Sequence, residues 1–185
     1  MGEENGSMKK ALPLLVLLAV VASGCSSSSA QNYKEGKVTR VYDGDTFEVK
    51  IDGQRDKIKL VGVNAPEIRW ENNPVDYRTI PDTRAAMHCL ETWGMKAETY
   101  INFNLSDEKV KLLNGTENMS QRNEGLQMYV RYNGTSINYF MIKNGYARAN
   151  EVDHSRKQKY IQAEKNAREN NRGLWQCDTP KTPEK

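Results

Sequence analysis

A β-hairpin signal constrains this chain more than any other feature. Residues Thr46–Ile51 alternate between apolar and polar side chains, and Asp52-Gly53 is a preferred two-residue turn. Lys57–Val63 has the pattern of the returning strand. The sequence therefore predicts a sheet-based fold with this hairpin at the centre of its most informative stretch, Val41–Glu67.

Oxygen-bearing side chains flank the hairpin on both sides. Asp43-Gly44-Asp45 precedes it, and Asn64-Ala65-Pro66-Glu67 follows it. If the fold brings these two motifs together, they form one small site of hard oxygen ligands, which suit Ca²⁺ or a similar cation. A spare carboxylate there could act as a general base. The alternative is two acidic surface turns, since Asp-Gly is common turn chemistry.

The N-terminus has the features of an export signal. Lys9 and Lys10 precede a short apolar run over residues 11–22, and small residues lead to Cys25. We interpret 1–24 as a lipoprotein-type signal peptide and 25–35 as the lipidated Cys25 and a flexible tether. The alternative is a plain signal peptide that happens to end beside a cysteine. Either interpretation predicts export, as a membrane lipoprotein facing outward or as a secreted protein.

The remaining chain is long enough for one compact domain, assigned to residues 36–177, with a polar tail over 178–185. Its net charge of +3 permits an anionic partner such as nucleic acid without requiring one. Cys89 and Cys177 form an even pair in an exported chain, which predicts a disulfide; two buried thiols are the alternative.

The hydrophobic pattern predicts five strands and about three helices. A helix capped by Asp82 or Thr83 follows a polar, irregular loop over Ile68–Pro81, and Gly94 weakens its middle. A last helix over about Asp153–Asn171 buries Tyr160, Ile161, Ala163 and Ala167. The other expected elements are strands at Tyr33–Tyr42, Lys109–Leu113 and Leu126–Tyr132 and a short helix around Ile137–Met141. This order favours an α+β, mainly β fold, a five-stranded Greek-key barrel of the oligonucleotide/oligosaccharide-binding (OB) kind.

Together these motifs resemble the staphylococcal nuclease (thermonuclease) family over roughly Gly36–Trp175. The residues that carry the resemblance are Val41–Thr46, Leu60–Glu67, Trp93-Gly94 with Ala97, Asn138, Asn144–Ala147 and Gly173-Leu174-Trp175. The resemblance implies a staphylococcal nuclease-like barrel and a Ca²⁺-dependent phosphodiesterase that acts on DNA or RNA.

The resemblance also implies roles for individual residues. Asp45 matches the main calcium carboxylate, and Asp43 matches a nearby acidic position that supports the metal site. Asn64 stands where the family usually has a second aspartate ligand, so the site loses one negative charge. Ala65 matches a ligand that acts through its backbone carbonyl. Glu67 matches the proposed general base, which activates a water for in-line attack on phosphorus.

Two further positions depart more seriously from the family pattern. Lys59 stands where the family has an arginine on the scissile phosphate and lacks its bidentate fork. Glu124 stands where a second arginine is usual, and Arg122 is a nearby substitute. Loss of such an arginine reduces phosphoryl-transfer rates by about 10³-fold or more, so reduced activity is expected. Lys57 and Arg78 are further candidates for substrate binding, although Lys57 also fits a solvated strand face.

The sequence therefore leaves three functional interpretations. The first is an exported, lipid-anchored, Ca²⁺-dependent nuclease, monomeric and without a predicted protein partner. The second is a catalytically impaired module on the same barrel that binds nucleic acid or protein. The third is a barrel used for adhesion or glycan binding.

Overall fold

The computed structural model describes residues 1–2, 33–69, 72–77, 79–115 and 125–178. The chain divides into two compact units, Met1–Ala30 and Gln31–Lys185, of which the second contains nearly all the described residues. The predicted signal peptide, Cys25 and the polar tail from residue 179 lie outside the described ranges. Within those ranges, no helix is long and apolar enough to cross a membrane.

Five strands form a closed barrel. The strands are β1 (Lys34–Val41), β2 (Thr46–Ile51), β3 (Gln54–Leu60), β5 (Lys109–Asn114) and β6 (Leu126–Tyr132). Neighbours pair antiparallel in the order β3-β2-β1-β5-β6, and a parallel β3–β6 pairing closes the ring. A register shift between Val38 and Arg40 in β1 is the kind of bulge that helps a strand curve to serve two neighbours. The fold is therefore the five-stranded OB-type barrel that the sequence predicts.

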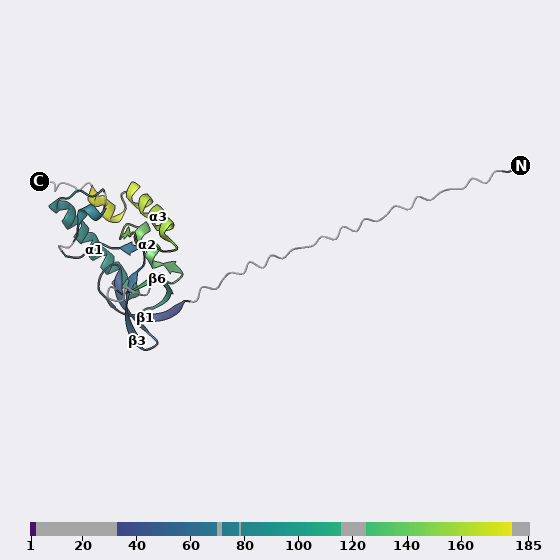
Figure 1. The fold of residues 1–185 in the computed structure, drawn as a ribbon, viewed down its shortest axis with the longest axis horizontal. Helices are drawn as coiled ribbons and strands as arrows, with labels where there is room; N and C mark the ends of the chain where they lie inside the picture. The colour runs from purple at the N-terminus through teal and green to yellow at the C-terminus, as the bar shows by residue number, and fades with distance from the viewer. Residues whose placement is uncertain (3–32, 70–71, 78, 116–124, 179–185) are drawn as a thin grey trace. The chain divides into compact units, whose positions relative to one another are not determined.

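Smaller elements complete the fold (Figure 1). Two short strands, β4 (Val63–Asn64) and β8 (Arg148–Ala149), pair with each other, and β7 (Thr135–Ser136) pairs antiparallel with β6. The helices are α1 (Arg84–Leu105), α2 (Ile137–Lys143), α3 (Lys157–Glu169) and the 3₁₀ turns η1 (Pro74–Tyr77) and η2 (Gly173–Asp178). Thr83 caps α1, as predicted, by accepting a hydrogen bond from the Ala86 amide at 3.2 Å.

The apolar residues form two clusters. The larger fills the barrel and includes Phe47, Leu60 and Ile101, all fully buried. The smaller lies where η2 packs on α1 and contains Leu90 and Trp175. A disulfide between Cys89 and Cys177 closes an 88-residue separation within this second cluster, a cross-link of the kind that stabilises a fold by a few kcal/mol.

Three local predictions need correction. Strand β1 begins at Lys34, within the predicted strand Tyr33–Tyr42, so the domain start assigned to Gly36 lies two residues inside the barrel. Helix α3 begins at Lys157 instead of near Asp153. Ile161, expected in the core, is 45 % exposed. The helix begins late because His154 leaves the helical path, with its Nδ1 2.9 Å from the Tyr129 hydroxyl. Ile161 is exposed because the buried face of α3 is formed by Tyr160, Ala163 and Ala167.

The Asn138 side chain makes three hydrogen bonds to backbone groups inside the core. It is fully buried, accepts a hydrogen bond from the Val130 amide at 2.8 Å, and donates to the carbonyls of Val61 and Met128, each at 3.0 Å. Replacing Asn138 by Leu would leave three buried backbone groups without this partner. We expect a loss of about 3 kcal/mol or more in unfolding free energy, measured by urea denaturation. Exposed Asn170 is the control, and Asn170→Ala should cost less than about 0.5 kcal/mol.

Candidate active site

The acidic turn between β1 and β2 is held tightly in place. The Thr46 carbonyl accepts hydrogen bonds from the amides of Tyr42 (3.0 Å) and Asp43 (3.2 Å). The Asp45 amide donates to Asp43 Oδ1 at 2.9 Å, the local bond that favours Asp in turns. Gly44 lies against α1, where an added Cβ would come within 2.5 Å of the Ala97 Cβ. The turn therefore presents both carboxylates in a fixed orientation.

Asp45 is buried beneath the segment that follows the hairpin. Its Oδ2 accepts a hydrogen bond from the Ala65 amide at 3.0 Å, and its Oδ1 accepts one from the Thr46 hydroxyl at 2.7 Å. The Lys59 ammonium lies 3.8 Å from Oδ1. Burial, reinforced by the neighbouring Asp43 charge and only partly opposed by Lys59, raises the pKa of Asp45 to about 7. The positive charge around the ionised Asp45 carboxylate is therefore too small to balance its negative charge.

Glu67 lies on the same segment with its side chain toward solvent. Its backbone is fixed by the amide group of Asn72, which accepts from the Glu67 N–H at 2.8 Å and donates to the Glu67 carbonyl at 2.7 Å. Helix α1 supports it from the other side, because an added Cβ on Gly94 would lie 2.8 Å from the Glu67 carbonyl oxygen. Asn72, five residues along the chain, and helix α1 thus position the backbone of the candidate general base.

Asn64 pairs with a residue that lies outside the predicted site. Its partner across β4–β8 is Arg148. With its amide oxygen directed at Arg148, Asn64 accepts hydrogen bonds from Nη2 at 3.0 Å and Nε at 3.1 Å. The Arg148 guanidinium also lies 5.4 Å from the ring centroid of Tyr77. The oxygen expected to bind a metal is therefore occupied by a guanidinium in this conformation.

Tyr77 and Arg148 extend the site beyond the predicted residues. Tyr77 is 3 % exposed, so its ring packs the loop onto the domain and is not available to stack on a nucleic-acid base. Burial raises the pKa of Tyr77; the charges of Glu67 and Asp45 raise it further, against the influence of Arg148. The ring therefore lies within electrostatic range of both key carboxylates. No local pattern pointed to Arg148, because its pairing with Asn64 depends on contact between strands that are distant in the sequence.

The two candidate lysines of β3 have different surroundings. Lys59 contacts Asp45 and keeps 26 % of its side chain exposed, so it combines a structural contact with access to a ligand. Lys57 is exposed, and its ammonium lies 5.6 Å from the Tyr42 ring centroid. Arg122 and Arg78, the other predicted substrate contacts, lie outside the described residues, as does Glu124.

The oxygen atoms of the site are of the chemical type that a hard divalent cation prefers, but only some of them are positioned to bind one. The neighbouring carboxylates of Asp45 and Asp43, compensated by one lysine, create the charge deficit that a bound cation would relieve. The Ala65 carbonyl can add a neutral oxygen. Among the described residues, however, no three His, Cys, Asp or Glu side chains form a group able to hold a metal. Complete coordination would therefore need the Asn64 oxygen to leave Arg148, or water.

Barrel and site together define a class of protein: an OB-type barrel that displays a buried carboxylate, a lysine and an exposed glutamate at one end of its first hairpin. A family model described as staphylococcal nuclease homologue matches residues 57–177. The chain belongs to the staphylococcal nuclease family.

Individual relatives agree with this assignment. An uncharacterized protein of Methanocaldococcus jannaschii is 30 % identical, and the match covers 91 % of this chain and 95 % of the relative's length. The thermonuclease of Staphylococcus hyicus is 27 % identical, and the match covers 83 % of this chain and 81 % of the thermonuclease. An endonuclease of Bacillus subtilis is 32 % identical over 82 % of this chain, which spans only 12 % of that larger protein.

Gly94 offers a test of how the Glu67 backbone is positioned. An Ala Cβ there would come within 2.6 Å of the Pro66 carbonyl oxygen and 2.8 Å of that of Glu67, so the segment must shift. We expect Gly94→Ala to lower kcat for phosphodiester hydrolysis by about 10²-fold, the typical effect of a misplacement near 1 Å. Met95→Ala, at the exposed next position, is the control and should leave kcat within about twofold. Unchanged kcat in Gly94→Ala would show that the contact does not position Glu67.

Proposed function

We propose that this protein is an exported, Ca²⁺-dependent nuclease that hydrolyses phosphodiester bonds of DNA or RNA. The observation that carries the proposal is the buried, charge-deficient Asp45 beside Lys59, with Glu67 exposed on the adjoining segment. Family membership and relatives named thermonuclease and endonuclease support nucleic acid as the substrate.

Each residue then has a defined role. Glu67 accepts a proton from a water molecule whose oxygen attacks phosphorus, and the bond from phosphorus to the leaving oxygen breaks. Lys59 binds a non-bridging phosphate oxygen. When bound, Ca²⁺ would be held by Asp45, the Ala65 carbonyl and Asn64, with Asp43 in support, and would supply electrostatic stabilisation of the developing phosphate charge.

The proposed activity is lower than in family members that have arginine at the Lys59 and Glu124 positions. Lys59 offers a single ammonium where a guanidinium would contact two oxygens. That ammonium also lies 3.8 Å from Asp45 Oδ1, so its charge is shared between Asp45 and the phosphate. Arg122 remains a candidate second cation. With these residues we expect an activity that is reduced but present.

We further propose that export places the domain outside the cytoplasm, with lipidated Cys25 as its membrane anchor. The apolar run over residues 11–22 and the small residues before Cys25 support this proposal. Mass spectrometry of the membrane-associated protein would detect the expected lipid on Cys25; a mature chain beginning elsewhere, without lipid, would contradict it.

Hydrolysis of single-stranded DNA by the purified protein tests the nuclease proposal. Cleavage should require added Ca²⁺, stop when a chelator is added, and resume when Ca²⁺ is restored in excess. Cleavage that persists in chelator would contradict the role of Ca²⁺. Absence of cleavage of both DNA and RNA under all these conditions would contradict the nuclease itself.

One observation favours a second candidate, a nucleic-acid-binding module with impaired catalysis. With its amide oxygen directed at Arg148, Asn64 accepts two hydrogen bonds from that guanidinium, so the oxygen proposed as a metal ligand already has partners. Oligonucleotide binding that weakens with salt but proceeds without turnover would support this candidate.

A further inference from the structure

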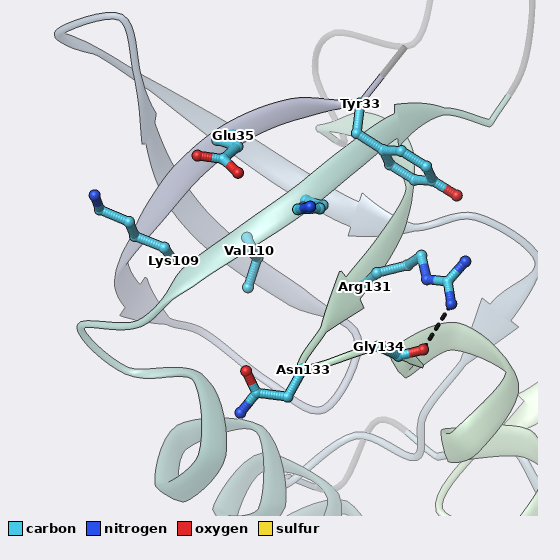
Figure 2. Close-up of a pocket in the computed structure, with 8 residues that line it drawn as sticks. Tyr33, Glu35, Lys109, Val110, Arg131, Asn133 and Gly134 are labelled. Atoms are coloured by element: carbon cyan, nitrogen blue, oxygen red, sulfur yellow. Dashed lines mark hydrogen bonds between the residues drawn. The ribbon is translucent and has the colours of Figure 1, made fainter. Parts of the chain in front are cut away.

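A basic pocket lies on the barrel wall away from the acidic site. It is formed by β1, β5 and the end of β6, with a volume of about 470 Å³, within the range of ligand pockets. Its lining contains three cationic side chains, Lys109, Lys111 and Arg131, against one carboxylate, Glu35. Figure 2 shows Tyr33 and Arg131 on one side of this pocket, with Glu35 and Lys109 on the other.

Several basic side chains elsewhere on the surface form ion pairs, in contrast to those of the pocket. Lys37 forms an ion pair with Asp107 at 2.9 Å, and Lys165 lies 3.8 Å from Glu169. No carboxylate among the described residues lies within ion-pair distance of Lys109, Lys111 or Arg131. The pocket therefore has a local excess of positive charge that an anionic ligand would neutralise.

One hydrogen bond holds the guanidinium side of the pocket in place: Arg131 Nη2 donates to the Gly134 carbonyl at 2.6 Å (Figure 2). Burial opposes the shift, but the nearby guanidinium groups of Arg131 and Arg156 lower the pKa of Tyr33, so its hydroxyl lies close to both cations. The Arg156 guanidinium also lies 3.9 Å from the Tyr129 ring centroid. The aromatic ring and the fixed cation thus lie together, a combination suited to a ligand that carries both phosphates and planar groups.

Strand β6 connects this pocket to the candidate active site. Gln127 pairs with Lys59, the residue that contacts Asp45, whereas Arg131 pairs with Lys111 of the pocket. The four intervening steps along a strand correspond to about 13 Å. OB-type barrels contact about 4–16 nucleotides, so one single strand is long enough to reach both places.

We propose that the pocket formed by Tyr33, Lys109, Lys111 and Arg131 is a second binding site for the backbone of a single-stranded nucleic acid. It holds the strand beyond the point of cleavage, and in that respect the proposal rests on the nuclease function. The ligand is a polyanion recognised through its phosphates, with Tyr33 available to stack on a base.

The test measures binding and cleavage separately. The full chain is titrated into a fluorescent 12-nucleotide single-stranded DNA in the presence of a chelator, and anisotropy gives the Kd. Changing both exposed lysines, Lys109→Gln with Lys111→Gln, should weaken binding roughly tenfold or more near 0.1 M salt and reduce the slope of log K against log salt by about 1.4. The control, Lys50→Gln with Lys143→Gln, removes equal charge from exposed positions outside the pocket and should change the Kd less than about threefold.

Two further measurements separate the pocket from catalysis. A nitrophenyl ester of a thymidine phosphate is too short to span both places, so the pocket variant should cleave it as the wild type does while its KM for the 12-nucleotide DNA rises. If neither substrate is cleaved, the nuclease proposal fails, but the binding result still decides the pocket. Unchanged 12-nucleotide binding in the pocket variant would overturn the proposal. So would loss of binding to phosphatidylglycerol vesicles with DNA binding intact, because the pocket would then recognise a lipid surface.

Discussion

Replacing Glu67 by Gln is expected to reduce phosphodiester hydrolysis by about 10²–10⁴-fold, the usual contribution of a general base. The substitution removes the proton acceptor while keeping the size of the side chain. The fold should persist, because Glu67 is exposed and Asn72 holds it through backbone groups. The measurement is kcat and KM on single-stranded DNA with Ca²⁺. The loss should fall on kcat, since the phosphate contacts remain.

A matched control distinguishes the base from a general effect of charge. Glu169 is exposed on α3, and Glu169→Gln also removes one carboxylate. This variant should hydrolyse DNA at the wild-type rate. Equal activity in Glu67→Gln and Glu169→Gln would show that another group, or hydroxide itself, accepts the proton, and the proposed mechanism would need a different base.

Local chemistry made most of the barrel predictable. Asp52 and Asn133 each adopt a positive φ followed by a positive-φ glycine, as expected for the two hairpin turns. The bounds of β2 and β6 match the predicted strands because alternation and turn residues fix both ends. Such signals lie within a few residues of one another, so they can be interpreted without knowing the tertiary structure.

The site was less predictable because several of its contacts join distant segments. The motifs around Asp45 and Glu67 predicted that the carboxylates lie close to one another, but nothing near Asn64 indicated that Arg148 would bind its amide oxygen. Gly94 was interpreted as a weak point in a helix; the structure gives it a different meaning, close approach of α1 to the Pro66 and Glu67 carbonyls. A glycine of this kind is explained only by the segment that packs against it.

The charge of Asp45 should affect stability and function in opposite directions. The ionised, buried carboxylate destabilises the fold, but the same charge would bind Ca²⁺. Its folded-state pKa of about 7 lies above the ordinary value of 3.8. The unfolded chain therefore releases this proton first, and the free energy of unfolding should fall as pH rises from about 4 to about 7 when Ca²⁺ is absent. We expect Asp45→Asn to remove this dependence and, at pH 8 in chelator, to raise the unfolding free energy by about 2 kcal/mol. This gain allows for the weaker hydrogen bonding of an amide to Ala65 and Thr46.

The same substitution should abolish Ca²⁺-dependent hydrolysis, since it removes the main anionic ligand. Urea denaturation at pH 5 and pH 8, with and without Ca²⁺, measures both effects: Ca²⁺ should stabilise the wild type and leave Asp45→Asn unchanged. Asp52→Asn, in an exposed turn that also suits Asn, is the control and should retain both activity and the response to Ca²⁺. A variant that is less stable than the wild type at pH 8 in chelator would mean that Lys59 and the hydrogen bonds to Asp45 already balance its charge. The buried carboxylate would then be a structural ion-pair partner, with no charge deficit for a cation to relieve.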